Sequence, residues 1–151
     1  MDLPPEVLLN SIRDFCVIYF KDKQHSKDAP PHFYVTFPIK DDLTLIICII
    51  TSQVKTQREY YRRVNPKAGK CLIPVSNDIF SFLDRDKKSV IDCNKAELLS
   101  KEELRKRIAP SVPLKIKEKI IPSYLKRDIC GAIIQSPLIA PFIKKIIKGQ
   151  K

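Results

Sequence analysis

The spacing of apolar residues changes twice along the chain of 151 residues. In the first part, apolar side chains recur every three or four positions, which is typical of one helical face. Two prolines stand at the start of this segment, where a missing backbone N–H costs little. The pattern predicts a helix over residues 4–21 and a loop over the polar segment 21–31, which ends in two prolines. The apolar face of that helix would consist of Val7, Leu8, Ile12, Phe15 and Tyr19.

The middle of the chain contains short runs of β-branched and aromatic residues between turn-forming residues. Strands are expected over residues 33–37, 43–51, 60–63, 70–75 and 89–93. The second of these has the highest β-branched content and is expected to be buried. Several short strands with turn signals between them indicate a small barrel or sandwich.

Helical signals return near residue 100. Ser100 followed by Glu103 is a capping-box sequence, and it predicts a helix that ends before Pro110. Residues 111–122 are interrupted by prolines and are expected to be extended. A helix over 123–134 should follow.

A last helix is predicted to begin at Ser136, with Pro137 in its first position. Its polar face would carry Lys144, Lys145 and Lys148, near the end of the helix where cations suit the dipole.

Together these elements predict an α+β protein that is mainly β with flanking helices. We expect an N-terminal helix and linker over residues 1–31, a small barrel over 32–110, and a basic helical extension over 111–151 that packs on the barrel.

The charge of the chain is concentrated near its C-terminus. The net charge is +11, and residues 101–151 alone hold 13 basic and 4 acidic side chains. A cationic segment of this kind favours a polyanionic partner, because each neutralised phosphate releases counterions. A solvated surface that keeps the protein soluble would look the same.

Several classes of protein have no support in the composition. The longest apolar run, Leu45 to Ile50, is far below the roughly 20 residues of a membrane span, and no secretory signal is recognisable. Three glycines form no phosphate-binding loop, so no nucleotide cofactor is expected. The five cysteines include no C-x-x-C pair, so neither a zinc site nor a disulfide framework is predicted. Four of them are expected in the core: Cys16, Cys48, Cys71 and Cys93. The expected compartment is the reducing cytoplasm.

The first candidate for chemistry is the end of the buried strand. Thr51 and Ser52 place two hydroxyl groups there, followed by the amide of Gln53. Side chains at a strand end are held by a rigid element yet reach solvent, which suits a catalytic or binding role. Hydroxyls in this position can equally satisfy a turn.

The second candidate is the basic segment 55–70, which we expect to be a loop around the short edge strand. Its arginines could hold phosphates while Tyr60 or Tyr61 stacks on an unpaired base. The alternative is a solvated loop with one of the two tyrosines folded into the core. The arginines in question are Arg58, Arg62 and Arg63.

The two histidines differ in context. His32 opens the first strand of the barrel, where a neutral imidazole could act as acid or base near pH 7. A purely structural role is the alternative. His25 lies in the polar linker and is expected to be incidental. Farther along, Asp92 and Asn94 are expected to form the polar outer side of a half-buried strand.

Two segments taken in order resemble toxins of the MazF/PemK/Kid class. They are CIITSQ at residues 48–53 and CLIPVSNDIFSFLDRDKKSVIDCNKAELLSKEELRKRI at 71–108, with a basic segment between them. The resemblance spans roughly residues 32–108, about half the chain.

The resemblance implies an SH3-like β-barrel and a metal-independent endoribonuclease that needs no cofactor. Members of this class are usually homodimers and are held inactive by an antitoxin protein. Thr51 matches the strand-end threonine of the class, with Ser52 beside it. The substrate would be single-stranded RNA, cleaved by attack of the ribose 2′-hydroxyl on the adjacent phosphorus.

The chain departs from the class at one position. The class commonly has Gly-x-Arg-Pro before its first long strand, and that arginine is catalytic, whereas residues 30–33 here are Pro-Pro-His-Phe. Either His32 transfers the proton while arginines of the basic segment stabilise the charge, or the site has decayed and only binding of nucleic acid or antitoxin remains.

The resulting hypothesis gives each candidate residue a role. Thr51 and Ser52 would contact the scissile phosphate, and His32 would be the acid or base. The remaining residues would bind RNA through phosphates or bases: Arg58, Tyr60, Tyr61, Arg62, Arg63, Lys144, Lys145 and Lys148. No metal ligand is assigned.

Overall fold

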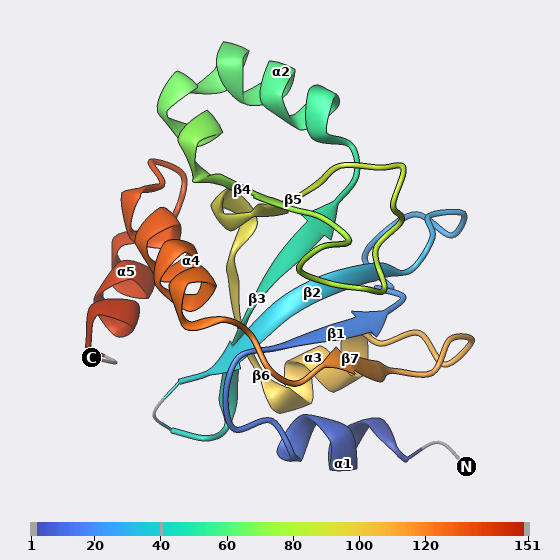
Figure 1. Cartoon of the computed structure of the whole chain (residues 1–151). Coiled ribbons are helices and arrows are strands. Elements are labelled where there is room, and N and C mark those ends of the chain that lie inside the picture. Colours follow the sequence, from blue (N-terminus) through green and yellow to red (C-terminus); the bar gives the residue numbers. More distant parts are fainter. Residues whose placement is uncertain (1–2, 40, 150–151) are drawn as a thin grey trace.

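The chain folds around one antiparallel sheet of seven strands with helices on both faces (Figure 1). The computed structural model describes residues 3–39 and 41–149. The strand order is β4-β5-β3-β2-β1-β7, and β6 pairs with β3 beside that path. The strands are β1 (Cys16–Phe20), β2 (His32–Pro38), β3 (Thr44–Thr51), β4 (Leu72–Val75), β5 (Ser89–Asp92), β6 (Glu97–Ser100) and β7 (Lys115–Glu118).

The mixed α+β class is confirmed, and the sheet is open. Strands β4 and β7 form the two ends of the strand order. The helices are α1 (Pro5–Asn10), α2 (Val54–Val64), α3 (Lys101–Arg107), α4 (Ser123–Gln135) and α5 (Pro141–Lys148). Short 3-10 turns span Pro66–Cys71 and Cys93–Lys95.

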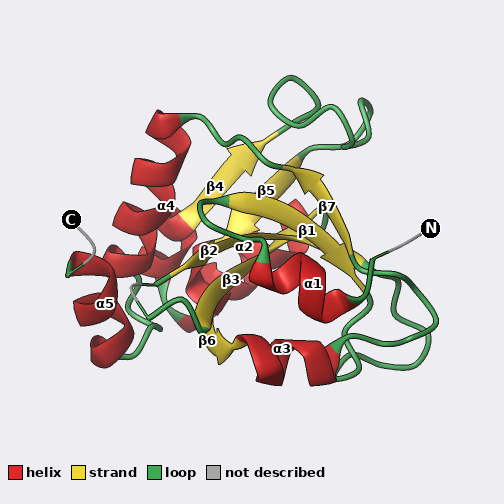
Figure 2. Ribbon diagram, turned by 90° about the horizontal axis from the view of Figure 1, so that it is seen from below, coloured by secondary structure: helices red, strands yellow, loops and turns green. Residues whose placement is uncertain are grey.

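The helices form layers on the two faces of the sheet (Figures 1 and 2). Helices α4 and α5 cover one face, where Ile129 and Ile143 share a core with Val35 of β2. Helices α1 and α3 cover the other face, where Leu9 and Leu104 pack with Ile18 of β1. Helix α2 stands apart from both layers, directly after the end of β3 (Figure 1).

Strand β3 is the centre of the sheet, and the expected buried strand is confirmed. It pairs with β2 along one edge, while the other edge pairs first with β6 and then with β5. Ile46 and Cys48 face the α4–α5 core, whereas Leu45 and Ile47 face the α1–α3 core. Because both faces of the strand are buried, its sequence is a continuous apolar run rather than an alternating one.

The predicted helix over residues 4–21 is wrong in its second half. Helix α1 ends at Asn10, and Cys16–Phe20 forms strand β1 between β2 and β7. The five residues of β1 are β-branched, aromatic or small, and the two faces of the strand contribute to different cores. A strand buried on both faces has no period of two, so its apolar positions also fitted a helical spacing.

The predicted edge strand 60–63 and the predicted loop over residues 55–70 are also wrong. This segment is helix α2, followed by the 3-10 turn Pro66–Cys71. Tyr61 is the one side chain of α2 that is buried. With a single buried position in 11 residues, the sequence carries no apolar periodicity that could have revealed the helix.

The capping box at Ser100 is confirmed, since its hydroxyl accepts from the Glu103 amide and the Glu103 carboxylate accepts from the Ser100 amide. The last helix begins at Pro141 rather than Pro137. Ser136 therefore does not begin this helix. Its buried hydroxyl donates a 2.7 Å hydrogen bond to the side-chain oxygen of Asn94.

The expected polar outer side of β5 is wrong as well. Asp92 and Asn94 are both buried, at 0% and 6% exposure. Their polar atoms bond within the fold, and the amide of Asn94 donates to the carbonyl of Ala68.

Four cysteines lie in the core as predicted: Cys16, Cys48, Cys71 and Cys93. Across residues 3–39 and 41–149, the structure contains no helix with the length and apolar character of a membrane span.

Candidate functional site

A groove of about 490 Å³ lies where β3 ends and α2 begins. The first turns of α2 form one wall, and the loop between β4 and β5 supplies the other. We call it the basic groove, and it is lined by Ser52, Val54, Lys55, Arg58, Glu59, Arg62, Lys87 and Lys88. The residues of α2 recur at helical spacing, so they present one face of the helix to the groove.

The charge of the basic groove is strongly positive, with five cationic side chains against the single carboxylate of Glu59. All five cations are exposed. Within the described part of the chain, none of the five forms an ion pair with a carboxylate. Their charges are therefore free to act on an anionic ligand. The backbone amides at the start of α2 add positive potential at the same end.

Helix α2 is held in place by one polar anchor. The hydroxyl of Tyr61 donates a 2.7 Å hydrogen bond to the Asp92 carboxyl group at the end of β5. The ring of Tyr61 packs with Ala68, Leu72 and Val90 in a small core of its own. Burial, together with the hydrogen bond to Asp92, raises the pKa of the Tyr61 phenol well above its usual range.

The two tyrosines of α2 differ in their exposure to solvent. Tyr61 is 2% exposed and cannot stack on a base, whereas Tyr60 is 45% exposed. The two rings meet edge to face, with their centroids 5.2 Å apart. Tyr60 is thus held by its buried neighbour while one side of its ring faces solvent.

The two hydroxyl residues at the end of β3 also differ in exposure. Thr51 is 9% exposed, and its Oγ1 accepts a 3.1 Å hydrogen bond from the amide of Gln53. This is the turn-stabilising role that the sequence left open. Ser52 is exposed and lines the basic groove beside the first turn of α2.

His32 does not line the basic groove, although the sheet brings it near Thr51. Phe33 pairs with Ile50 at the end of the β2–β3 ladder. Continued by one residue, that register sets His32 opposite Thr51, and directly opposed residues share a face of the sheet. His32 therefore lies one strand away from the hydroxyl that precedes the groove.

His25, expected to be incidental, is the neighbour of His32. The two imidazole centroids lie 5.4 Å apart with the rings at 83°. The Nδ1 atoms of both rings are buried without a hydrogen-bond partner. The ammonium of Lys21 closes the loop between the two histidines by donating to the carbonyls of Ser26 and Ala29. No pattern in the sequence indicates this closure, so the sequence does not predict that the two rings meet.

The environment of His32 favours its neutral form. Burial lowers the pKa of the imidazole, and the nearby His25 and Lys21 lower it further. The carbonyl of Pro30 and the carboxylate of Asp22 act in the opposite direction without reversing the shift. A neutral imidazole near pH 7 can accept a proton.

The remaining predicted RNA-binding residues lie outside the basic groove. Arg63 is an exposed side chain of α2 that is not among the groove-lining residues. Lys145 and Lys148 are exposed and Lys144 is half-buried on α5, which packs beside α4. Among the predicted residues, the structure thus brings Ser52, Arg58 and Arg62 together.

Lys87 and Lys88 belong to the groove but could not be identified from the sequence. Their loop sits between two expected strands, and adjacent lysines in such a loop look like an ordinary solvated turn. In residues 3–39 and 41–149, no three His, Cys, Asp or Glu side chains are grouped as metal ligands would be.

Comparison of the chain with protein-family models, with curated proteins and with solved structures found no match in any of the three. The function of the chain must therefore be inferred from the geometry of these residues.

Proposed function

We propose that the chain is a metal-independent endoribonuclease that binds single-stranded RNA across the basic groove. The observation that carries the proposal is the gathering of five unpaired cations around the exposed Ser52 at the end of β3. The proposed architecture is a divergent form of the SH3-like barrel of the MazF/PemK/Kid type, in which the sheet stays open between β4 and β7. In its favour, β3 is shared between β2 on one edge and β6 and β5 on the other.

Binding would be dominated by the phosphate backbone. Arg58 and Arg62 stand one turn apart on α2, with Lys87 and Lys88 across the groove. Such a cationic channel follows a backbone without reading sequence, and binding through it weakens as salt rises. Tyr60 is not a groove-lining residue, because it lies on the side of α2 away from Arg58 and Arg62. Its exposed ring would offer a platform for one unpaired base where the RNA strand leaves the groove and passes over α2.

Cleavage would join the ribose 2′-oxygen to the adjacent phosphorus and break the bond from phosphorus to the 5′-oxygen. The products are a 2′,3′-cyclic phosphate and a 5′-hydroxyl. The attacking hydroxyl must lose a proton, the leaving oxygen must gain one, and the phosphorane carries extra negative charge. Arg58 and Arg62 would stabilise that charge, while Ser52 donates a hydrogen bond to a phosphate oxygen.

The neutral His32 would accept the proton from the 2′-hydroxyl. Two features support this role: its lowered pKa and its place opposite Thr51 in the β2–β3 register. His25 lies beside it and could exchange the proton. The leaving 5′-oxygen would take its proton from solvent water, since the side chains around the groove are exposed. In this proposal the histidines replace the arginine that the MazF/PemK/Kid class has before its first long strand.

A cleavage assay in EDTA tests the proposal. Pure protein should cut a long single-stranded RNA and leave cyclic-phosphate ends. Arg58→Ala/Arg62→Ala should reduce the rate about 10²-fold or more, since both charges on the phosphorane are removed. Lys115→Ala/Lys117→Ala removes the same charge from exposed positions on β7, at the other end of the sheet, and should cut normally.

Absence of cleavage from mildly acidic to mildly basic pH would overturn the nuclease proposal. If His32→Ala cuts as fast as the wild type, the proton-transfer role is wrong and the nuclease stands without it.

A second candidate is a binding module without catalysis. It is favoured by the missing arginine and by the position of His32 outside the basic groove. RNA affinity that falls steeply with salt, without cleavage, would select this candidate. Failure to bind any RNA or DNA at low salt would leave an antitoxin-binding role. A homodimer and an antitoxin partner belong to the proposal through the resemblance to the MazF/PemK/Kid class. A cytoplasmic location belongs to it through the cysteines, which include no C-x-x-C pair.

A further inference from the structure

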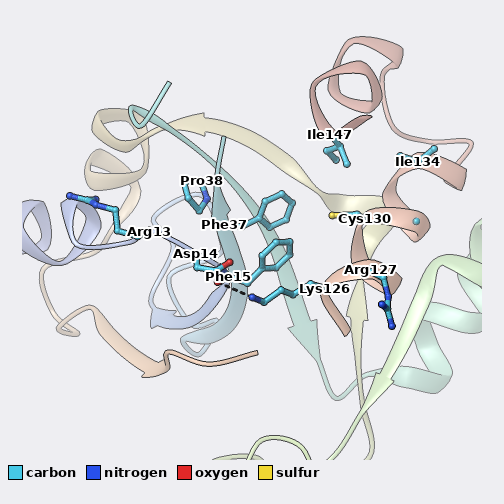
Figure 3. Close-up of a pocket in the computed structure, with 11 residues that line it drawn as sticks. Arg13, Asp14, Phe15, Phe37, Pro38, Lys126, Arg127, Cys130, Ile134 and Ile147 are labelled. Carbon is cyan, nitrogen blue, oxygen red and sulfur yellow. Dashed lines mark hydrogen bonds and ion pairs between the residues drawn. The ribbon is translucent and has the colours of Figure 1, made fainter. Parts of the chain in front are cut away.

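A second cavity, of about 570 Å³, opens between the sheet and the helices α4 and α5 (Figure 3). Phe15 and Phe37 line it on the sheet side, and Cys130, Ile134 and Ile147 line it from the helices. The basic groove is lined by α2 and the β4–β5 loop instead. The two sites share no residue.

The sheet side of this cavity is a rigid aromatic surface. The rings of Phe15 and Phe37 stack with their centroids 4.2 Å apart and their planes at 13°. In Figure 3, Cys130 and Ile147 point toward this pair from the opposite side of the cavity. An apolar body placed between them would be covered on two sides, and removal of its apolar surface from water would favour binding.

Gly131 leaves one position in the α4 wall of the cavity without a side chain. It lies inside α4 and lines the cavity. A glycine inside a helix is less favourable than an alanine. Neither usual reason for a glycine applies, because its φ is not positive and an added Cβ would meet no atom within 4 Å. The glycine therefore weakens the helix without relieving a clash.

The rim of the cavity is cationic. Arg13, Lys126 and Arg127 stand around it with one carboxylate, Asp14. Lys126 lies 2.8 Å from Asp14 in an ion pair, and its ammonium is 5.8 Å from the centroid of the Phe15 ring. Arg127 is exposed and forms no ion pair with any described residue. An anionic group at the mouth is therefore favoured over a cationic one.

We propose that this cavity binds a small amphipathic anion: a carboxylate on a hydrocarbon or aromatic body. The body would lie between the phenylalanine pair and the α4–α5 side chains, beside Gly131. The carboxylate would remain at the mouth near Arg127 and Lys126. The volume is within the roughly 300–1,000 Å³ of small-molecule sites, and an apolar interior with few charged groups is their usual character.

Calorimetric titration of the full chain with decanoate, below its micelle concentration, tests the proposal. One decanoate should bind per chain, and decyltrimethylammonium, with the same hydrocarbon and a positive head, should bind at least 10-fold more weakly. Equal affinity for both probes, or no saturable binding of decanoate, would overturn the proposal.

Two substitutions at one position locate the site. Gly131→Leu should occupy part of the cavity and weaken decanoate binding at least 10-fold. The Tm should not fall, because leucine favours a helix more than glycine does and a Cβ at this position meets no atom within 4 Å. Gly131→Ala is the matched control, since it strengthens the helix but leaves most of the volume open, and it should bind decanoate nearly as the wild type does. Unchanged binding by Gly131→Leu would place the ligand elsewhere and overturn the assignment.

Sedimentation distinguishes a second copy of the chain from a small ligand. The proposal expects the same molecular mass for wild type and Gly131→Leu. A wild-type dimer that becomes a monomer on this substitution would make the cavity a subunit interface and would overturn the proposal. RNA binding in the basic groove should be unaffected by either substitution at Gly131.

Discussion

The hydroxyl of Tyr61 on helix α2 and the carboxyl group of Asp92 at the end of β5 are joined by a buried 2.7 Å hydrogen bond. Tyr61 is the buried side chain of a helix that otherwise faces solvent. The bond therefore connects the wall of the basic groove to strand β5. This hydrogen bond and the packing of the Tyr61 ring on Ala68, Leu72 and Val90 orient the helix that carries Arg58 and Arg62.

Removing the anchor hydroxyl should destabilise the protein. Tyr61→Phe leaves a carboxyl oxygen of Asp92 buried without its donor, and we expect the free energy of unfolding to fall by about 1–3 kcal/mol. RNA affinity should fall as well, because α2 would be held less firmly. Urea unfolding measures the first effect. Tyr60→Phe removes a hydroxyl from the exposed neighbour and should change stability by less than about 0.5 kcal/mol. Equal stability of the two variants would show that the bond is not an anchor.

The exposed ring of Tyr60 should contribute to RNA binding without contributing to the fold. Tyr60→Ala is expected to weaken binding of a single-stranded oligonucleotide by about 1–3 kcal/mol, the usual value of one base stacked on an aromatic ring. Tyr60→Phe keeps the ring and should bind like the wild type. The comparison is made by fluorescence anisotropy at fixed salt. Full affinity of Tyr60→Ala would mean that no base rests on this ring.

His32 should make stability depend on pH in a defined window. Burial and neighbouring charges lower its pKa in the folded state, so below about pH 6.5 the unfolded state binds more protons than the folded state. The free energy of unfolding should therefore fall as pH drops from about 7.5 to about 5.5. One proton sets a ceiling of about 1.4 kcal/mol per pH unit, and a half-buried group will give less. Urea unfolding at several pH values should show that His32→Gln reduces this slope, and an unchanged slope would assign it to other groups.

A buried ion pair fixes the loop that carries His25. Asp22 is 1% exposed and accepts hydrogen bonds from the guanidinium of Arg107, which also contacts Glu97. Burial alone would raise the pKa of Asp22, but the hydrogen bonds from Arg107 and from the amide of Gln24 hold it below its usual value. The loop is thereby tied to the end of α3.

Loss of Arg107 should be costly because it leaves a buried carboxylate unpaired. Arg107→Met is expected to lower the free energy of unfolding by about 3–5 kcal/mol. Lys106→Met removes a cation from the exposed pair with Glu102 and should cost less than about 1 kcal/mol. Denaturant midpoints of the two variants provide the measurement. A similar small loss for both would mean that Asp22 finds water when Arg107 is removed.

The sequence predicted elements whose local signals agree with their tertiary position. The buried run of β3 and the capping box at Ser100 are examples, because β-branched content and cap chemistry act locally. Strand β1 has the apolar spacing of a helix, because a strand covered on both faces by two cores lacks the alternation that identifies strands. Helix α2 was missed because its one buried residue, Tyr61, cannot establish a period.

The sequence predicts only part of the candidate site, because local sequence patterns do not show which distant segments meet. Ser52, Arg58 and Arg62 lie close together in sequence, so the end of one strand and the start of one helix bring them to the basic groove. Lys87 and Lys88 reach it from a distant loop, and His25 meets His32 across a closed loop. Proximity of this kind is set by strand order and loop closure, which leave no pattern in the residues themselves.

The affinity of the protein for a single-stranded RNA oligonucleotide, measured as a function of salt, tests whether RNA binds in the basic groove. We expect log K to fall steeply with log salt. Arg58→Ala/Arg62→Ala should make that slope shallower by roughly 0.7 for each phosphate that the variant no longer neutralises. Lys115→Ala/Lys117→Ala should keep the wild-type slope. Equal slopes and affinities for all three proteins would contradict the account, because the basic groove would then not be where RNA binds.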